Sequence, residues 1–124
     1  MTKLNLHRDP TITLIRSYQE GEIRIGTQRY THSIIVTSQG VVKWPISSIE
    51  TLQNADFSSV FEMSFRTELV ILGTGSKLVF PGAEKTRSLI DAQIGLETMD
   101  TAAACRTYNI LADDGRNVVA CLLV

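Results

Sequence analysis

Two apolar runs place the strongest limit on the fold of this chain. Leu69–Leu72, directly after Glu68, and Val118–Val124 contain no charged side chain. A strand that is apolar on both faces must be covered on both faces, as in the parallel sheets of α/β proteins. We therefore predict two strands buried in a sheet, with Val118–Val124 away from an open edge. Shorter strands are predicted at 77–80 and 95–99.

Three other segments have the spacing of amphipathic helices. One follows Asp56 and extends to residue 65, the second covers 83–93, and the third covers 101–112. Asp56 and Asp100 are the expected N-caps, because a short carboxylate side chain can accept hydrogen bonds from the free N–H groups of a helix start. The side chains predicted to face the core are Phe57, Val60, Phe61, Phe65, Ala83, Leu89, Ile90, Ile94, Ala104, Cys105, Tyr108 and Leu111.

The first part of the chain has the pattern of two β-hairpins. Residues 11–18 are rich in β-branched side chains and precede a turn into 22–25, and 33–37 precede a turn into 41–44. The sequence thus predicts an α/β fold. We expect a layered single domain over residues 1–124, with a mixed central sheet, helices packed on it, and antiparallel hairpins from the N-terminal half.

Length and charge limit the classes of function. A chain of 124 residues has the size of one domain, and 12 Lys and Arg against 13 Asp and Glu give a net charge of -1. There is no overall charge that would attract nucleic acid or anionic lipid. Residues 1–10 lack the apolar segment of a secretory signal, and no stretch approaches the roughly 18 to 20 apolar residues of a membrane span. We expect a cytoplasmic protein that binds no nucleic acid and does not insert into membranes.

The glycine pair after the first apolar run is the main candidate for ligand binding. Gly73, Thr74 and Gly75 follow a predicted strand, and loops at the carboxyl ends of such strands often bind ligands. Asp100 and Thr101 begin the last predicted helix, whose free N–H groups suit an anion. The alternatives are a tight turn at the glycines and simple capping by Asp100. The full dinucleotide and phosphate-loop patterns are absent.

Three residues are candidates for a protein interface. Trp44, before Pro45, could expose an aromatic ring at the end of the second hairpin, and aromatic and arginine side chains are favoured at interfaces. Arg106 and Asn109 fall on the side of the last helix away from its apolar residues. The alternatives are a core tryptophan and a solvated helix face.

The sequence offers no catalytic set and no metal site. His7 and His32 belong to no catalytic motif, and no Cys/His or acidic cluster has ligand spacing, so we name no catalytic residue, no metal ligand and no cofactor. Cys105 and Cys121 are expected to be reduced and buried, although they could meet as a redox pair if the last helix packs on the last strand. Whether the protein is an enzyme stays open, with the balance against it.

The residues also resemble a known family. The matching segments are Val70-Ile71-Leu72-Gly73-Thr74-Gly75, the stretch 95–111, Ile34-Ile35-Val36-Thr37 and the Trp44-Pro45 turn. This combination is similar to a small Mth-type domain family of unknown function that is shared by bacteria, archaea and mitochondria, and that includes mitochondrial complex I assembly factor 3. The resemblance implies a layered α/β fold and implies no reaction.

Two functions are therefore weighed. The first is a non-enzymatic interaction or assembly factor, in respiratory complex assembly by resemblance, with protein partners and with a homodimer as one expected assembly. The second is a small-ligand or anion-binding protein, with or without enzymatic activity, that uses the loop Gly73–Gly75 and the helix start at Thr101.

Overall fold

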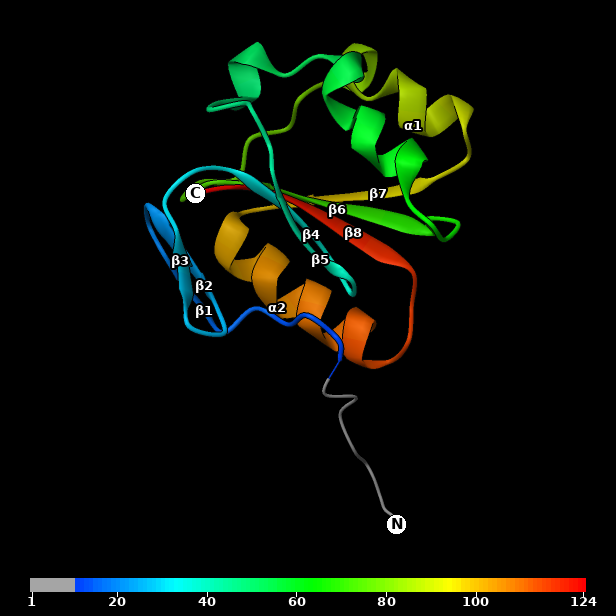
Figure 1. Ribbon diagram of the computed structural model, residues 1–124. Coiled ribbons are helices and arrows are strands. Elements are labelled where there is room, and N and C mark those ends of the chain that lie inside the picture. Colours follow the sequence, from blue (N-terminus) through cyan, green and yellow to red (C-terminus); the bar gives the residue numbers. More distant parts are fainter. Residues whose placement is uncertain (1–10) are drawn as a thin grey trace.

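A mixed five-stranded sheet forms the centre of the computed structural model, which describes residues 11–124 (Figure 1). Its strands lie side by side in the order β5-β4-β8-β6-β7. β6 is parallel to β7 and β8, whereas β4 is antiparallel to β5 and β8. The strands are β4 (Ile34–Thr37), β5 (Gly40–Lys43), β6 (Leu69–Thr74), β7 (Gly95–Met99) and β8 (Val118–Leu123). The α/β fold with a mixed central sheet is thus confirmed.

The two apolar runs lie where the sequence predicts them. Every residue of β8 is buried, and β8 lies in the middle of the sheet between β4 and β6. In β6 only Leu69 is partly exposed. Both strands are covered on both faces, which is the arrangement that their uniformly apolar composition requires.

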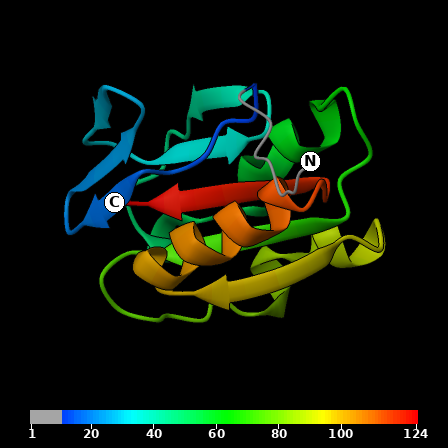
Figure 2. The same cartoon turned by 90° about the horizontal axis from the view of Figure 1, so that it is seen from below.

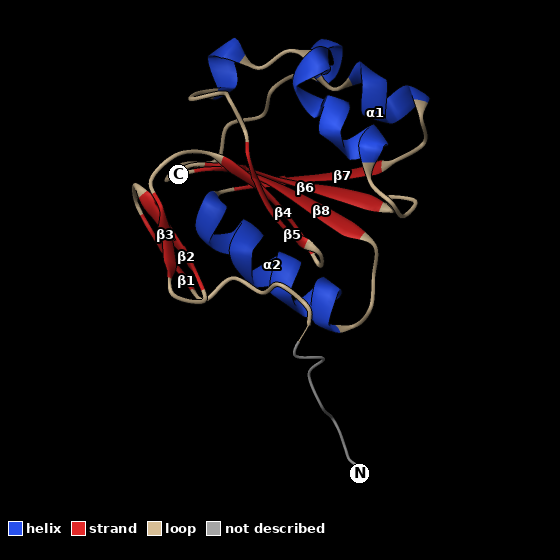
Figure 3. Cartoon of the chain, in the orientation of Figure 1, coloured by secondary structure: helices blue, strands red, loops and turns tan. Residues whose placement is uncertain are grey.

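Helices cover both faces of the sheet (Figures 2 and 3). Ile71 of β6 belongs to the core beneath α2 (Thr101–Asp113), whereas Val70 and Leu72 belong to the core on the opposite face. This alternation follows from the two-residue period of a strand. The opposite face is covered by the 3₁₀ helices η1 (Ile49–Thr51), η2 (Asn54–Glu62) and η3 (Ala83–Lys85) and by α1 (Arg87–Asp91).

A second, three-stranded antiparallel sheet packs beside α2. Its strands are β1 (Ser17–Gln19), β2 (Glu22–Ile25) and β3 (Gln28–Tyr30). Ile23 is fully buried in the core beneath α2. On β2, Glu22 accepts hydrogen bonds from Arg29 at 2.7 Å and from Arg24 at 2.9 Å, and these bonds lower the pKa of its carboxyl. Both predicted hairpins are present.

The first predicted strand is shorter than expected. Residues 11–16 do not belong to it: only the Arg16 N–H still donates to β2, at the Arg24 carbonyl, while side chains of α2 bind the backbone of Thr13 and Ile15. Tyr108 donates from its hydroxyl to the Thr13 carbonyl at 2.7 Å, and Asn109 binds both the N–H and the carbonyl of Ile15, at 2.8 and 2.7 Å. The segment therefore lies across the helix rather than in a sheet.

Two other predicted elements are corrected by the structure. No strand forms at 77–80, because the Thr74 hydroxyl donates to the Lys77 carbonyl at 2.6 Å and accepts from the Val79 N–H at 3.1 Å, which folds the chain back on itself. The predicted helix 83–93 is interrupted at Thr86, which has φ −118° and ψ 11°. Leu89 is buried as expected, but Ala83 and Ile90 are exposed.

The helix near Asp56 begins earlier than predicted and is a 3₁₀ helix. Its N-cap is Gln53, and Asp56 is the third helical residue, whose carboxylate accepts from the Gln53 N–H at 2.8 Å. This is a capping box, in which the acidic residue lies inside the first turn. Phe57 and Val60 are buried as predicted, whereas Phe61 is half exposed.

Candidate functional site

Thr101 forms hydrogen bonds with the glycine segment, where the sequence predicted a ligand. Gly73 lies inside β6, and a Cβ at this position would come within 2.9 Å of both the Leu122 side chain and the Thr101 hydroxyl. That hydroxyl accepts a hydrogen bond from the Gly75 N–H at 2.8 Å and donates to the Leu123 carbonyl at 2.6 Å. The Thr101 N–H donates to the Gly75 carbonyl at 2.8 Å. The polar groups expected to bind a ligand are thus used to join β6, β8 and α2.

Asp100 is the N-cap of α2. Its carboxylate accepts a hydrogen bond from the Ala103 N–H at 2.9 Å. This bond satisfies one of the free donors of the helix start, as the capping alternative requires. Thr101, the next residue, is fully buried. Neither side chain is placed as the sequence-based anion site would need.

Trp44 is a core residue and not an exposed aromatic. Only 2% of its surface is accessible, its Nε1 donates to the Asp56 carbonyl at 2.8 Å, and its ring lies 6.0 Å from that of Phe57. The ring therefore anchors η2 to the sheet. The prediction that Trp44 presents an aromatic side chain to a partner is wrong, because that side chain lies in the core.

The two interface candidates on α2 have different environments. Arg106 is exposed, as predicted from its helical position. Asn109 is half-buried, and its amide is occupied by the backbone of Ile15. Asn109 therefore holds the segment 11–16 against α2, and only Arg106 is left with a side chain available to a partner.

A surface feature that the sequence did not reveal lies directly after β6. Leu78, Val79 and Phe80 are 49%, 38% and 71% exposed, and the two hydrogen bonds to the Thr74 hydroxyl hold the loop that carries them. Three consecutive large apolar side chains on the surface are unusual, since most such runs are buried. The run is visible in the sequence, but its position between the glycine pair and Pro81 indicated a short strand.

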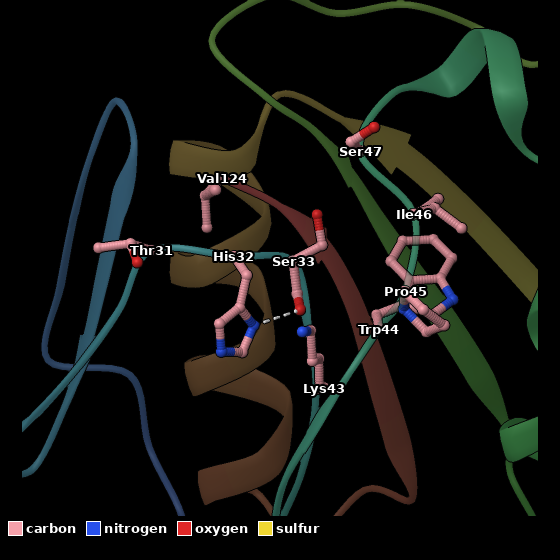
Figure 4. A pocket seen from close by; sticks show the side chains of 9 residues that line it. All are labelled: Thr31, His32, Ser33, Lys43, Trp44, Pro45, Ile46, Ser47 and Val124. Atoms are coloured by element: carbon pink, nitrogen blue, oxygen red, sulfur yellow. Dashed lines mark hydrogen bonds between the residues drawn. The ribbon is translucent and has the colours of Figure 1, made fainter.

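A large pocket lies at the end of the sheet where β8 finishes, β4 begins and β5 ends. Its volume is about 430 Å³ (Figure 4). It is lined by Thr31, His32, Ser33, Lys43, Trp44, Pro45, Ile46, Ser47 and Val124. A second pocket of about 220 Å³ shares Ser47 and Val124 with it and also includes Thr74, Gly75 and Val79. The exposed apolar loop and both pockets thus lie at one end of the sheet.

The two cysteines lie on opposite faces of the sheet. Cys105 belongs to the core beneath α2, and Cys121 belongs to the core on the other face. The redox-pair interpretation is therefore wrong, because β8 separates the two sulfur atoms. Burial raises the pKa of the Cys105 thiol to about 12, and burial also raises the pKa of Cys121. The reactive thiolate is thus disfavoured at both positions.

We expect neither thiol to react in the folded protein. At pH 8 a thiol with a pKa of about 12 is a thiolate only about one part in ten thousand of the time. Titration with Ellman's reagent at pH 8 should leave both cysteines unlabelled in native buffer and should label two per chain in guanidinium chloride. Rapid labelling of one cysteine in native buffer would contradict the buried positions of the two thiols.

Within residues 11–124, no group of three or more His, Cys, Asp or Glu side chains could hold a metal ion. The same residues contain no helix that is both long enough and apolar enough to span a bilayer. The expectation that residues 1–10 carry no secretory signal lies outside the described residues.

The fold places the chain in a known structural class. A solved structure from Bordetella pertussis, described as a Mth938-like domain, has a TM-score of 0.79 and 28% sequence identity, over 98% of this chain and 92% of that chain. The structure is thus that of a Mth938-like α/β domain. The chain belongs to the family described as "Protein of unknown function (DUF498/DUF598)", whose model matches residues 15–123. The family resemblance inferred from the residues is confirmed.

Two relatives carry informative names. The chain is 29% identical over 114 residues to NADH dehydrogenase (ubiquinone) 1 alpha subcomplex assembly factor 3 of Rattus norvegicus, covering 92% of this chain and 62% of that protein. It is 24% identical to the "13 kDa major membrane protein" of Francisella tularensis, with 88% of both chains covered. This chain therefore spans less than two thirds of the length of the assembly factor.

Proposed function

We propose that the protein is a non-enzymatic assembly factor that binds other proteins through the exposed segment Leu78–Phe80. The observation that carries the proposal is this apolar segment, which is held in a fixed loop by Thr74. Clusters of exposed apolar side chains favour protein contacts, and aromatic residues are common anchors in interfaces. The name of the rat relative supports a role in the assembly of a respiratory complex.

The position of the segment also favours docking. Leu78, Val79 and Phe80 lie at the end of the sheet that carries the two pockets, so a partner that covers the loop can also enter the smaller pocket beside Val79. Arg106 lies on α2, on another part of the surface, and stays a second candidate contact. In this proposal the partners are proteins, the chain acts in the cytoplasm, and neither a cofactor nor a nucleic acid takes part.

Replacing Phe80 by Ser is expected to weaken partner binding strongly with little change in stability. The Phe80 ring is 71% exposed, so its removal should change the free energy of unfolding by no more than about 0.5 kcal/mol, whereas loss of an aromatic anchor typically weakens an interface by 2 kcal/mol or more, roughly thirtyfold. The measurement is affinity purification of the tagged protein from its own host after mild cross-linking, followed by mass spectrometry.

Ile110→Ser is the matched control for this experiment. Ile110 is 69% exposed, nearly as much as Phe80, but it lies on the outer face of α2. The control variant should recover the same respiratory-complex subunits as the unmodified protein. Equal recovery from the Phe80→Ser and Ile110→Ser variants would contradict the proposed docking segment. Failure of the unmodified protein to recover any such subunit would overturn the assembly role itself.

A further inference from the structure

The large pocket has the size and the position of a small-molecule site. Its volume of about 430 Å³ lies within the range of about 300 to 1,000 Å³ that is usual for ligand pockets. It lies where β8, parallel to β6 on one side and antiparallel to β4 on the other, ends. In open α/β sheets, ligands bind beyond the carboxyl ends of the strands, where the chain order reverses.

The charged side chains of the pocket favour an anion. Among the nine lining residues there is no Asp or Glu side chain, and the two ionisable side chains are Lys43 and His32. Within residues 11–124, Lys43 forms no ion pair, so its ammonium group is free to bind an acid.

Backbone hydrogen bonds fix the walls at this end of the pocket. The Ser33 carbonyl accepts from the Trp44 N–H at 2.9 Å and from His32 Nδ1 at 3.0 Å, and the dashed line in Figure 4 marks the second bond. The edge of the His32 ring also meets the Tyr30 ring, with 6.0 Å between their centroids. The imidazole and the strand ends are thus positioned before any ligand arrives, which lowers the entropic cost of binding.

Ser33 adds a polar group that the fold does not use. The residue is only 5% exposed and lines the pocket, and its hydroxyl has no hydrogen-bond partner among residues 11–124. The Ser33 Oγ atom is not one of the fully buried side-chain atoms that lack a partner, so it is accessible from the pocket and can donate a hydrogen bond to a ligand there. The opposite wall, formed by Pro45 and Ile46, is apolar.

We propose that this pocket binds a small organic acid, with its carboxylate or phosphate group at Lys43 and Ser33 and its apolar body against Pro45 and Ile46. Lys43 supplies the positive charge, the Ser33 hydroxyl donates a hydrogen bond, and the His32 ring forms a side wall. The pocket is lined by none of the residues Leu78–Phe80, so the variants of the two sites differ, and binding of an acid and capture of a protein partner can fail separately.

Titration of the folded, isotope-labelled protein with benzoate and with phenyl phosphate tests this proposal. The amide signals of residues 31–33, 43, 44, 46 and 47 should shift and saturate. The acid that binds more tightly identifies whether the site prefers a carboxylate or a phosphate. Benzamide, which has the same ring and no charge, should bind much more weakly. Equal binding of benzamide and benzoate, or no saturable shift with either acid at millimolar concentration, would overturn the proposal.

Variants of the two lysines near this end of the sheet make the test specific. Lys43→Met should weaken binding of the acid about tenfold, because a charge-assisted hydrogen bond is lost while the apolar stem is kept. Lys77→Met is the control, since Lys77 is equally an exposed lysine but does not line the pocket. Ser33→Ala should weaken binding without changing the fold. Unchanged affinity in both Lys43→Met and Ser33→Ala would place the acid elsewhere.

Discussion

Replacing Thr101 by Val is expected to lower the free energy of unfolding by about 2 to 5 kcal/mol. The substitution keeps the shape of the side chain but removes the hydroxyl that binds the Gly75 N–H at 2.8 Å and the Leu123 carbonyl at 2.6 Å. Thr101 is fully buried, so water cannot take the place of the hydroxyl. Each buried polar group that loses its partner costs about 1 to 3 kcal/mol.

Chemical denaturation followed by far-UV circular dichroism measures this loss. Thr101→Ser is the control, because it keeps the hydroxyl and removes one methyl group, which costs only about 1 kcal/mol. The two variants together separate the hydrogen bonds from the packing. If Thr101→Val is as stable as Thr101→Ser, then the hydroxyl does not join the three elements, and the glycine segment is available to a ligand after all.

The sequence predicted the elements whose signals are local. The uncharged run Val118–Val124 required burial on both faces, and β8 indeed lies in the middle of the sheet. Asp100 lies before the apolar positions of α2 and caps that helix. In each case the physical cause, apolar composition or a short carboxylate at a helix start, is contained in a few adjacent residues.

The features that the sequence did not predict depend on contacts between distant residues. Asn109 falls on the outward side of α2 by helical spacing, and it becomes half-buried only because Ile15, 94 positions earlier, crosses the helix there. The segment 77–80 has strand-forming residues, but the Thr74 hydroxyl folds it into an exposed loop. Local propensity is therefore overruled by side-chain hydrogen bonds that only the folded chain creates.

The candidate site in the structure differs from the predicted one for the same reason. The glycines after β6 indicated a ligand loop, but one buried hydroxyl from α2 occupies their polar groups. The large pocket instead combines residues before β4, after β5 and after β8, which are far apart in sequence. No sequence motif could indicate such a site. Its residues come together only through the antiparallel pairing of β4 with β5 and β8.

Truncation of Trp44 to Ala should destabilise the whole domain by about 3 to 5 kcal/mol and not act selectively on partner binding. The indole is 2% exposed, packs against Phe57 and donates to the Asp56 carbonyl, so its removal leaves a large cavity and an unpaired carbonyl. Because Trp44 is the only tryptophan of the chain, unfolding is followed by circular dichroism in urea and not by fluorescence.

Trp44→Phe is the control for this prediction, because it fills most of the cavity but loses the Nε1 hydrogen bond to the Asp56 carbonyl. We expect its free energy of unfolding to lie between those of the unmodified protein and Trp44→Ala. Any loss of partners in Trp44→Ala should then follow the unfolded fraction, whereas Phe80→Ser should lose partners while fully folded. A Trp44→Ala variant that keeps its full stability but loses its partners would mean that the indole, and not the loop at Phe80, forms the contact surface.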